Sequence, residues 1–324
     1  MNMEKEILLE VKKLKKYFPM KNFFGVKTCD VKAVDDVSFV IYKGETFGLV
    51  GESGCGKSTL GRTILQMLKA DSGSVIYNGR DIANLSRSKW ADLRSKLQII
   101  FQDPYSALNP NWTVKELIQE PLKNAGYSRK ECDERVQALL KLVNMNPDDM
   151  HKFSYEFSGG QRQRIGIARA VANYPEFIFC DEPISALDVS VQAQVVNMLK
   201  DLQQEMGLTY LFTAHDLSMV HHFSDRIGVM YLGSMVELGT SEEVFRNPIH
   251  PYTRALISAI PVADPELGRK TRRIPIEGEL PSPMNVPQGC RFCTRCPHAT
   301  EQCRTERPEF REITPGHFAR CHIL

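Results

Sequence analysis

Apolar and polar residues alternate near the N-terminus, and this alternation predicts β-strands. Val34, Val37, Phe39 and Ile41 are apolar positions within polar surroundings, which is the pattern of strands that bury one face. The segment PMKNFFGVKTCD, residues 19–30, lies between two such stretches and is predicted to be a loop. The first part of the chain should therefore consist mainly of half-buried strands.

The middle of the chain contains both helical patterns of apolar residues and short, continuous apolar runs. The segments LIQEPLKNAG and ECDERVQALLKLVNM have the apolar spacing of helices, whereas FIFCDEP and TYLFTAHD are short apolar runs that end in polar residues. Such runs are typical of buried parallel strands. Strands that alternate with helices predict a layered α/β core. After about residue 260 the chain is rich in proline, glycine and charge, so we expect an irregular arm there.

Composition narrows the class of protein. A chain of 324 residues has room for one large domain with an appendage. Its net charge of +2 gives no reason to expect a strong attraction to nucleic acid or to a membrane surface. We find neither a secretion signal nor an apolar stretch long enough to span a bilayer. The nine cysteines do not follow the pattern of a short secreted scaffold, so we expect a cytosolic protein.

A phosphate-binding loop is predicted where the sequence reads GESGCGKST, from Gly51 onward. A strand-like run, TFGLV, precedes this loop and a helix-like run, LGRTILQMLK, follows it. Gly51, Gly54 and Gly56 let the backbone point its N–H groups at an anion, and the helix adds its positive N-terminal end. We expect Lys57 to reach the β- and γ-phosphates of a nucleotide and Ser58 to bind Mg²⁺. The other loop residues assigned to nucleotide binding are Ser53, Cys55 and Thr59.

Two acids follow the apolar run FIFC. Asp181 stands at the predicted carboxyl end of a strand, where ligands bind in open α/β sheets. We expect Asp181 to hold Mg²⁺ through water and Glu182 to orient or deprotonate the attacking water. Pro183 comes next and, with the buried strand, confines both acids to the sheet edge.

A second glycine-rich helix start is predicted in FSGGQRQRIGIARA, residues 157–170. Ser158, Gly159 and Gly160 precede the helical run, and a helix N-terminus of this kind can accept an anion. One nucleotide does not need two such sites from one chain. We therefore expect this loop to cap the γ-phosphate of a nucleotide that a partner subunit holds.

These motifs and their order resemble those of the ATP-binding subunit of an ABC transporter, over about residues 7–260. The resemblance implies a P-loop ATPase with a RecA-like α/β core, an antiparallel β subdomain and a helical subdomain near residues 104–170. It implies a nucleotide-binding domain over residues 1–260, followed by a C-terminal extension over residues 261–324. Hydrolysis of ATP with Mg²⁺ is the activity that it implies.

The resemblance assigns further residues to the nucleotide site. Gln102, in IIFQDP, resembles the glutamine that senses Mg²⁺ and contacts the membrane subunit. Asp188 ends the stretch that resembles the D-loop, and His215 resembles the switch histidine at the γ-phosphate. Tyr17 resembles the aromatic residue that stacks on adenine, with the adjacent Phe18 as the alternative. The residues that resemble the family's signature motif are Ser158, Gly159, Gly160 and Gln161.

The segments after the cassette resemble one group within this family. HPYTRALISAIP, GELPSP and the cysteine-rich tail are similar to the extension of oligopeptide and dipeptide importers, and NPNWTVKELIQEPL is similar to their second ATPase subunit. The resemblance implies a peripheral subunit at the cytoplasmic face of the membrane. Its partners would be a second ATPase in a heterodimer, two permeases and an extracellular solute-binding protein. Importers of nickel or other small solutes in the same group are the alternative.

Five cysteines crowd the end of the chain and indicate a metal site. The C-x-x-C spacings in GCRFCTRCPHATEQC suit zinc, and the same run is similar to the bacterial ferredoxin pattern, so both metals stay open on the residues alone. The peptide-importer extension typically carries cysteines where Cys290, Cys296, Cys303 and Cys321 stand. The resemblance therefore favours a [4Fe-4S] cluster on these four thiols, with Cys293 as an additional thiol. We expect the cluster to tie down an arm that lacks its own core, with a redox switch on transport as the alternative role.

Two other classes of ABC ATPase carry cysteine-bound metals. DNA-repair members interrupt the cassette with zinc modules and present basic surfaces, and ribosome-recycling members have two cassettes and an N-terminal cluster region. This chain has a single uninterrupted cassette, a near-neutral charge and a C-terminal cysteine group. We therefore expect no nucleic-acid partner.

Overall fold

The computed structural model describes residues 5–261 and 273–323. The chain divides into two compact units, each with its own set of strands and helices. The first unit comprises residues 1–6, 42–45 and 85–214, and the second unit comprises residues 7–41, 46–84 and 215–324. In the described part of the chain, no helix combines the length and apolarity needed to cross a membrane. The expected boundary near residue 261 adjoins residues 262–272, which lie outside the described part, and it stays a prediction.

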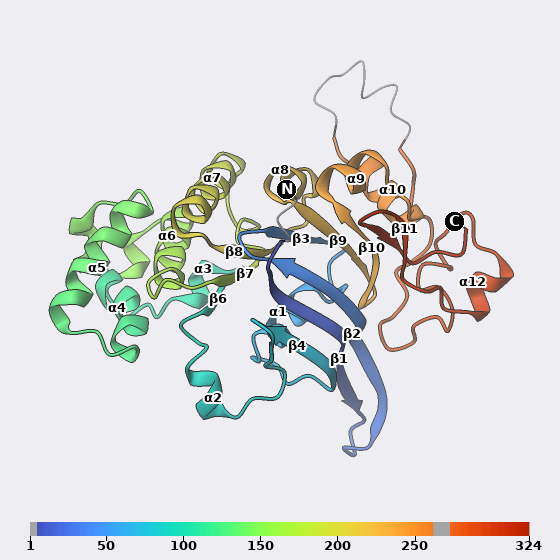
Figure 1. Cartoon of the computed structure of the whole chain (residues 1–324), viewed down its shortest axis with the longest axis horizontal. Coiled ribbons are helices and arrows are strands. Elements are labelled where there is room, and N and C mark those ends of the chain that lie inside the picture. Colours follow the sequence, from blue (N-terminus) through green and yellow to red (C-terminus); the bar gives the residue numbers. More distant parts are fainter. Residues whose placement is uncertain (1–4, 262–272, 324) are drawn as a thin grey trace. The chain divides into compact units, whose positions relative to one another are not determined.

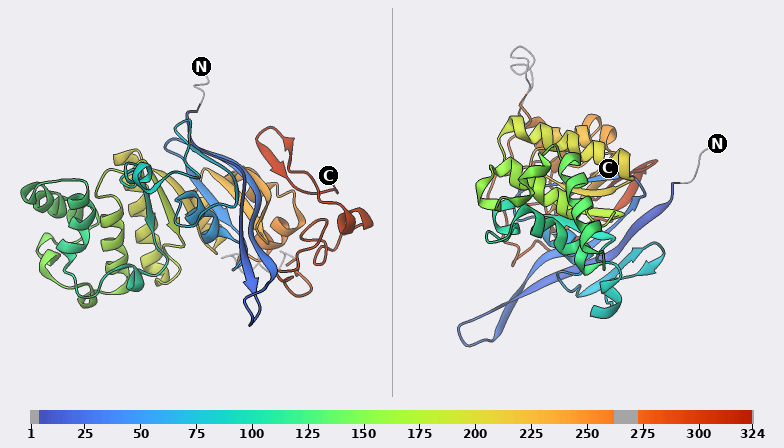
Figure 2. Two further views of the ribbon diagram at one scale, coloured as in Figure 1. Left: turned by 90° about the horizontal axis from the view of Figure 1, so that it is seen from below. Right: turned by 90° about the vertical axis from the view of Figure 1, so that its left-hand side faces the viewer.

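A long two-stranded ribbon dominates the N-terminal part of the second unit (Figures 1 and 2). The ribbon belongs to a four-stranded sheet of order β2-β1-β4-β5, in which β1 pairs antiparallel with β4. The expected loop over residues 19–30 is mostly strand, because the Asn22 side chain closes a tight turn by accepting hydrogen bonds from the N–H groups of Phe24 and Val26. The strands are β1 (Ile7–Lys21), β2 (Lys27–Tyr42), β4 (Ser72–Tyr77) and β5 (Arg80–Asp81).

The second unit also holds a row of strands in the order β11-β12-β10-β9-β3. Strands β3 and β9 are parallel, whereas β9, β10, β12 and β11 pair antiparallel in turn. The strands are β3 (Thr46–Val50), β9 (Arg226–Tyr231), β10 (Ser234–Thr240), β11 (Arg311–Thr314) and β12 (His317–Ala319). The helices of this unit are α1 (Lys57–Ile64), α8 (Leu217–Phe223), α9 (Ser241–Arg246), α10 (Pro251–Ser258) and α12 (Glu301–Thr305). The arm expected to be irregular thus ends in a hairpin, β11–β12, that extends this sheet by hydrogen bonding to β10.

Three parallel strands form the centre of the first unit, in the order β8-β7-β6. The apolar runs FIFC and TYLF are fully buried in β7 and β8, as their composition predicts. The strands are β6 (Leu97–Ile100), β7 (Phe177–Asp181) and β8 (Thr209–Thr213). The helices are α2 (Arg87–Ala91), α3 (Pro104–Ala107), α4 (Val114–Asn124), α5 (Arg129–Leu142), α6 (Gly159–Ala170) and α7 (Val189–Met206), with 3₁₀ turns at Pro147–His151 and Ser154–Glu156.

Reciprocal caps define where the central helices of the first unit begin. Thr113 and Glu116 form a capping box at the start of α4, and Ser128 and Glu131 form another at the start of α5. Each box satisfies backbone N–H groups that the helix itself leaves without partners. These local signals explain why helices form in the two segments whose apolar spacing predicts them. The α/β class expected from the alternating patterns is observed.

Candidate functional site

The phosphate loop connects β3 to α1 in the second unit. Gly51 and Gly56 have φ angles of 151° and 108°, and a Cβ atom at either position would collide with a carbonyl oxygen of a neighbouring strand. Only glycine fits there. The buried ammonium of Lys57 donates hydrogen bonds to the carbonyl oxygens of Gly51 at 2.8 Å and Glu52 at 3.3 Å. The backbone of the loop therefore surrounds the lysine that the motif assigns to phosphate.

The other predicted loop residues differ in exposure. Ser53 and Gly54 are exposed, Ser58 and Thr59 are half-buried, and Cys55 is buried. The Cys55 sulfur lies 3.9 Å from the lysine ammonium, so its side chain packs inside the loop. The serine and glycine that face solvent leave the outer side of the loop open to a ligand.

His215 lies beside the phosphate loop within the second unit. A surface hollow is lined by Gly51, Glu52, His215 and Asp216, together with apolar residues of the second unit. The Asp216 side chain accepts a hydrogen bond from the N–H of Ser218 at 2.8 Å and caps α8. This cap holds the backbone next to the histidine at the start of a helix, close to the loop that would carry the phosphates.

Asp181 and Glu182 stand at the carboxyl end of β7 in the first unit, with 0% and 5% of their surfaces exposed. Glu182 has a φ angle of 48°, a left-handed conformation that costs about 1–3 kcal/mol in a residue of this type. Its N–H donates to Thr213 Oγ1 at 2.9 Å, and its carboxylate accepts a hydrogen bond from Gln102 Nε2 at 2.8 Å. The structure thus joins two residues that the sequence assigned to catalysis.

The predicted signature loop forms the start of α6. The Ser158 hydroxyl accepts a hydrogen bond from the N–H of Gln161 at 3.4 Å, and the Gln161 side chain accepts one from the N–H of Ser158 at 3.0 Å. A Cβ atom at Gly160 would lie 2.6 Å from a methyl carbon of Val191, so a larger residue here would displace the Val191 side chain. Ser158 is exposed, and this helix N-terminus therefore faces solvent.

The D-loop leads directly from the acid pair to α7. The Ser185 hydroxyl donates to the carbonyl oxygen of Glu182 at 3.0 Å. Asp188 occupies the position before α7, and its exposed side chain makes no capping hydrogen bond to the helix. The D-loop is therefore anchored at its acid-pair end and exposed at Asp188.

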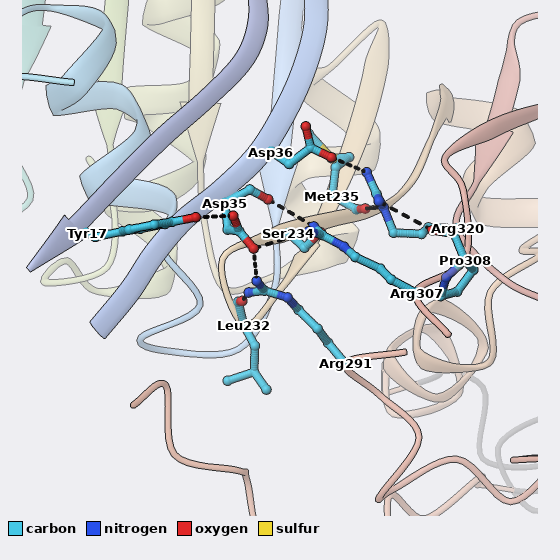
Figure 3. Close-up of polar contacts among 10 residues, drawn as sticks. All are labelled: Tyr17, Asp35, Asp36, Leu232, Ser234, Met235, Arg291, Arg307, Pro308 and Arg320. Carbon is cyan, nitrogen blue, oxygen red and sulfur yellow. Dashed lines mark hydrogen bonds and ion pairs between the residues drawn. The ribbon is translucent and has the colours of Figure 1, made fainter. Parts of the chain in front are cut away.

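Tyr17 lies on β1, half-buried, and its hydroxyl donates a hydrogen bond to the carboxylate of Asp35 (Figure 3). Phe18 is the next residue, so the alternation of a strand directs it to the other face. The ammonium of Lys16 lies 5.3 Å from the centre of the Phe18 ring. The two aromatic candidates therefore occupy different surroundings, and only the tyrosine is anchored through a hydroxyl.

Sequence reasoning missed a set of contacts on the phosphate loop. The Arg295 guanidinium donates to both carboxylate oxygens of Glu52, at 3.2 and 2.9 Å. The N–H of Glu52 donates to the Tyr252 hydroxyl at 2.9 Å. The arginine and the glutamate lie 243 residues apart, so no local pattern links them. The C-terminal segment thus contacts the loop directly.

All nine cysteines are free thiols. Cys290, Cys293, Cys303 and Cys321 are buried and Cys296 is half-buried, and the N–H of Cys290 donates to the carbonyl oxygen of Cys303 at 2.8 Å. Burial, reinforced by the neighbouring thiols, raises the pKa of Cys290 to about 12. Within residues 5–261 and 273–323, however, no three His, Cys, Asp or Glu side chains are grouped so as to hold a metal ion. The side-chain arrangement does not support the expected cluster.

Solved structures of the same fold are ATP-binding cassettes. The cbiO1 protein of Clostridium perfringens, part of the ABC transporter complex cbiONQ, is 27% identical, with a TM-score of 0.65 over 75% of this chain and 92% of its own. A dimeric cassette in a post-hydrolysis state with ADP and Pi is 28% identical, with a TM-score of 0.65 over 72% of this chain and 99% of its own. The ABC transporter family matches residues 34–185. The fold and the phosphate loop therefore define an ATPase of the ABC class.

Curated relatives narrow this class. Oligopeptide transport ATP-binding protein AppF of Bacillus subtilis is 52% identical over 98% of both chains. A relative named putative oligopeptide transport ATP-binding protein YkfD, from the same organism, is 56% identical over 98% of this chain and 95% of its own. Oligopeptide transport ATP-binding protein OppF of Salmonella typhimurium is 51% identical over 94% of this chain and 93% of its own. The family described as oligopeptide/dipeptide transporter, C-terminal region, matches residues 236–303. The chain belongs to the ATP-binding proteins of oligopeptide/dipeptide ABC transporters.

Proposed function

We propose that this chain hydrolyses ATP to power the import of oligopeptides or dipeptides through partner permeases. The observation that carries the proposal is the similarity to oligopeptide transport ATP-binding proteins over nearly the whole chain. This similarity includes the C-terminal region over residues 236–303, which lies entirely beyond the ABC transporter match over residues 34–185. The phosphate loop and the buried acid pair supply residues of the types that ATP hydrolysis needs.

In this proposal each motif has one task. Lys57 binds the β- and γ-phosphates, Ser58 and Asp181 hold Mg²⁺, Glu182 positions the attacking water and His215 contacts the γ-phosphate. The buried lysine and the Gln102–Glu182 hydrogen bond support these assignments. The remaining proposed nucleotide-binding residues are Tyr17, Gly51, Ser53, Gly54, Cys55, Gly56, Thr59, Gln102, Ser158, Gly159, Gly160, Gln161 and Asp188.

The proposed assembly is a heterodimer with a second ATPase, below two permeases at the cytoplasmic face of the membrane. An extracellular solute-binding protein delivers the peptide. Membrane vesicles that contain the whole assembly should accumulate labelled peptide when ATP is supplied. Vesicles that accumulate nickel but no peptide would favour the alternative within the group. ATPase stimulation by DNA or ribosomes, with none by permease vesicles, would reject transport altogether.

Ser158→Arg is expected to block hydrolysis of the nucleotide on the partner ATPase, while this chain's own nucleotide still turns over. The exposed serine caps the N-terminus of α6, and an arginine there would obstruct the approach of a γ-phosphate from the partner. The measurement is hydrolysis at each site of a mixed dimer, followed with one photo-trapped nucleotide per site. Ser128→Arg is a matched control, because Ser128 caps α5 with the same kind of capping box. Loss confined to this chain's own site would contradict the proposal.

We further propose that Cys290, Cys296, Cys303 and Cys321 hold a [4Fe-4S] cluster, with zinc as the alternative. The proposal rests on the resemblance of these four positions to the cysteines of the peptide-importer extension, because the side chains of the described residues are not grouped around a metal. The four thiols are free, three of them are buried, and the main-chain N–H of Cys290 donates to the carbonyl oxygen of Cys303. When bound, the cluster would cross-link the segments that carry its ligands. Anaerobic purification should yield brown protein with about four irons and four sulfides per chain.

Cys303→Ser is expected to remove the brown colour and the iron, whereas Cys293→Ser retains both. Each variant removes one buried thiol from the same segment, so the pair controls for general damage to packing. Iron and sulfide per chain are determined by chemical analysis, and the colour is measured by visible absorption. Colourless wild-type protein that holds one zinc would overturn the iron–sulfur assignment. Loss of iron in Cys293→Ser and not in Cys303→Ser would overturn the choice of ligands.

A further inference from the structure

The hydroxyl of Tyr17 is anchored by a buried carboxylate. It donates a hydrogen bond to Asp35, which is 5% exposed and lies on β2 (Figure 3). Burial and this hydrogen bond raise the pKa of Tyr17. The tyrosine therefore stays protonated as the donor, and its ring is held at the hydroxyl end.

Two arginines of the C-terminal segment converge on the same carboxylate (Figure 3). Arg291, 6% exposed, donates to the Asp35 side chain and to the carbonyl oxygen of Leu232. Arg307 donates to the Asp35 carboxylate at 3.2 Å, to its carbonyl oxygen at 3.1 Å and to the Ser234 hydroxyl at 2.9 Å. Burial opposes the charge of Asp35, but the tyrosine and both arginines hold its pKa below the ordinary value.

Main-chain hydrogen bonds connect the backbone of Asp35 to the phosphate loop. The N–H of Asp35 donates to the carbonyl oxygen of Gly233 at 2.7 Å, and the N–H of Gly233 donates to the carbonyl oxygen of Cys55 at 2.8 Å. The anchor of Tyr17 is therefore two hydrogen bonds away from the loop that would bind the phosphates. If Tyr17 stacks on adenine, as proposed above, the base of a nucleotide on this loop lies next to the Asp35 network.

We propose that Asp35 and Arg291 are positioning residues that hold the Tyr17 ring for the adenine base, so that the C-terminal segment sets the affinity for ATP. The inference rests on the proposed stacking role of Tyr17. A buried carboxylate needs charged partners to stay ionised, and here they come from a segment far away in the sequence. Because Arg291 follows Cys290 directly, disorder in the cysteine-rich segment would release the anchor of the tyrosine.

The test compares binding of ATP with binding of inorganic tripolyphosphate to the full-length chain by calorimetry. Tyr17→Phe and Arg291→Met should each weaken ATP binding by about two- to ten-fold, the effect of losing one hydrogen-bonded anchor. Binding of tripolyphosphate should not change, because this ligand has no base. Arg320→Met is the matched control: Arg320 is a largely buried arginine of the same segment, but it pairs with Asp36 and does not contact Tyr17.

The double variant sharpens the test. In the Tyr17→Phe background, Arg291→Met should weaken ATP binding no further, because both changes remove the same anchor. An equal loss of ATP and tripolyphosphate binding in Arg291→Met, or unchanged ATP binding in Tyr17→Phe, would overturn the positioning role.

Tyr17→Ala separates this inference from the proposed function. If Tyr17→Ala weakens ATP binding while Tyr17→Phe and Arg291→Met do not, stacking stands and the positioning role is wrong. If Tyr17→Ala leaves ATP binding unchanged, the stacking role itself fails, and the positioning role fails with it. A loss in all three variants that spares tripolyphosphate supports both.

Discussion

Glu182→Gln is expected to lower the rate of ATP hydrolysis at this chain's own site by a factor of about 10²–10⁴, the usual effect of removing a catalytic base. ATP binding should remain, because an amide of nearly the same size preserves the packing around this buried side chain. The Gln102 amide donates to the carboxylate in the present structure, and a glutamine oxygen can accept the same hydrogen bond. The variant therefore removes proton acceptance and retains the geometry.

The measurement is single-turnover hydrolysis by the assembled ATPase dimer with the partner site silenced. Glu176→Gln is the matched control: Glu176 directly precedes β7 at its opposite end, and its partly exposed carboxylate pairs with Lys96. Exposed ion pairs of this kind contribute little to stability, so hydrolysis by this control should match wild type. Near-normal turnover by Glu182→Gln would refute its role as base.

Lys57→Ala is expected to weaken ATP binding by about 100-fold or more, because it removes charge-assisted hydrogen bonds worth about 1.5–3 kcal/mol each. The buried ammonium already lies within the loop, bonded to the carbonyl oxygens of Gly51 and Glu52. The side chain therefore needs little rearrangement to meet phosphates that enter the loop. AMP, which lacks the β- and γ-phosphates, should bind the variant and the wild type with similar affinity.

Calorimetry with ATP and AMP makes this measurement, and thermal unfolding shows whether the variant retains its fold. Lys69→Ala is the control, since Lys69 is an exposed lysine shortly after α1. A Lys57→Ala protein that unfolds at the wild-type temperature and binds ATP with wild-type affinity would exclude the lysine from phosphate binding. Equal losses of ATP and AMP binding would show that the lysine supports the loop and does not select the β- and γ-phosphates.

The parts of the candidate site that lie within short segments were predictable from the sequence alone. The loop from Gly51 to Lys57, the acids after β7 and the helix start at Ser158 each depend on neighbouring residues, because turns, strand ends and caps are set by local backbone geometry. The same holds for the fully buried strands β7 and β8, which their apolar runs predict. The sequence pattern does not reveal the full length of the β1–β2 ribbon, because the turn between the strands is only five residues long, 22–26, and is closed by Asn22.

The role of the C-terminal segment was decided by the tertiary structure alone. Arg291 and Arg307 meet Asp35 across 256 and 272 residues, and Arg295 meets Glu52 across 243. No periodicity or spacing reveals the partner of a charged residue so far away in the sequence. The pattern therefore predicts that these arginines belong to an exposed polar arm. Pairing of β12 with β10 brings the segment onto the sheet of the second unit. There, each buried arginine needs a carboxylate or carbonyl oxygen as a hydrogen-bond acceptor. The hydrogen bonds that meet this requirement link the C-terminal segment to Tyr17 and to the phosphate loop.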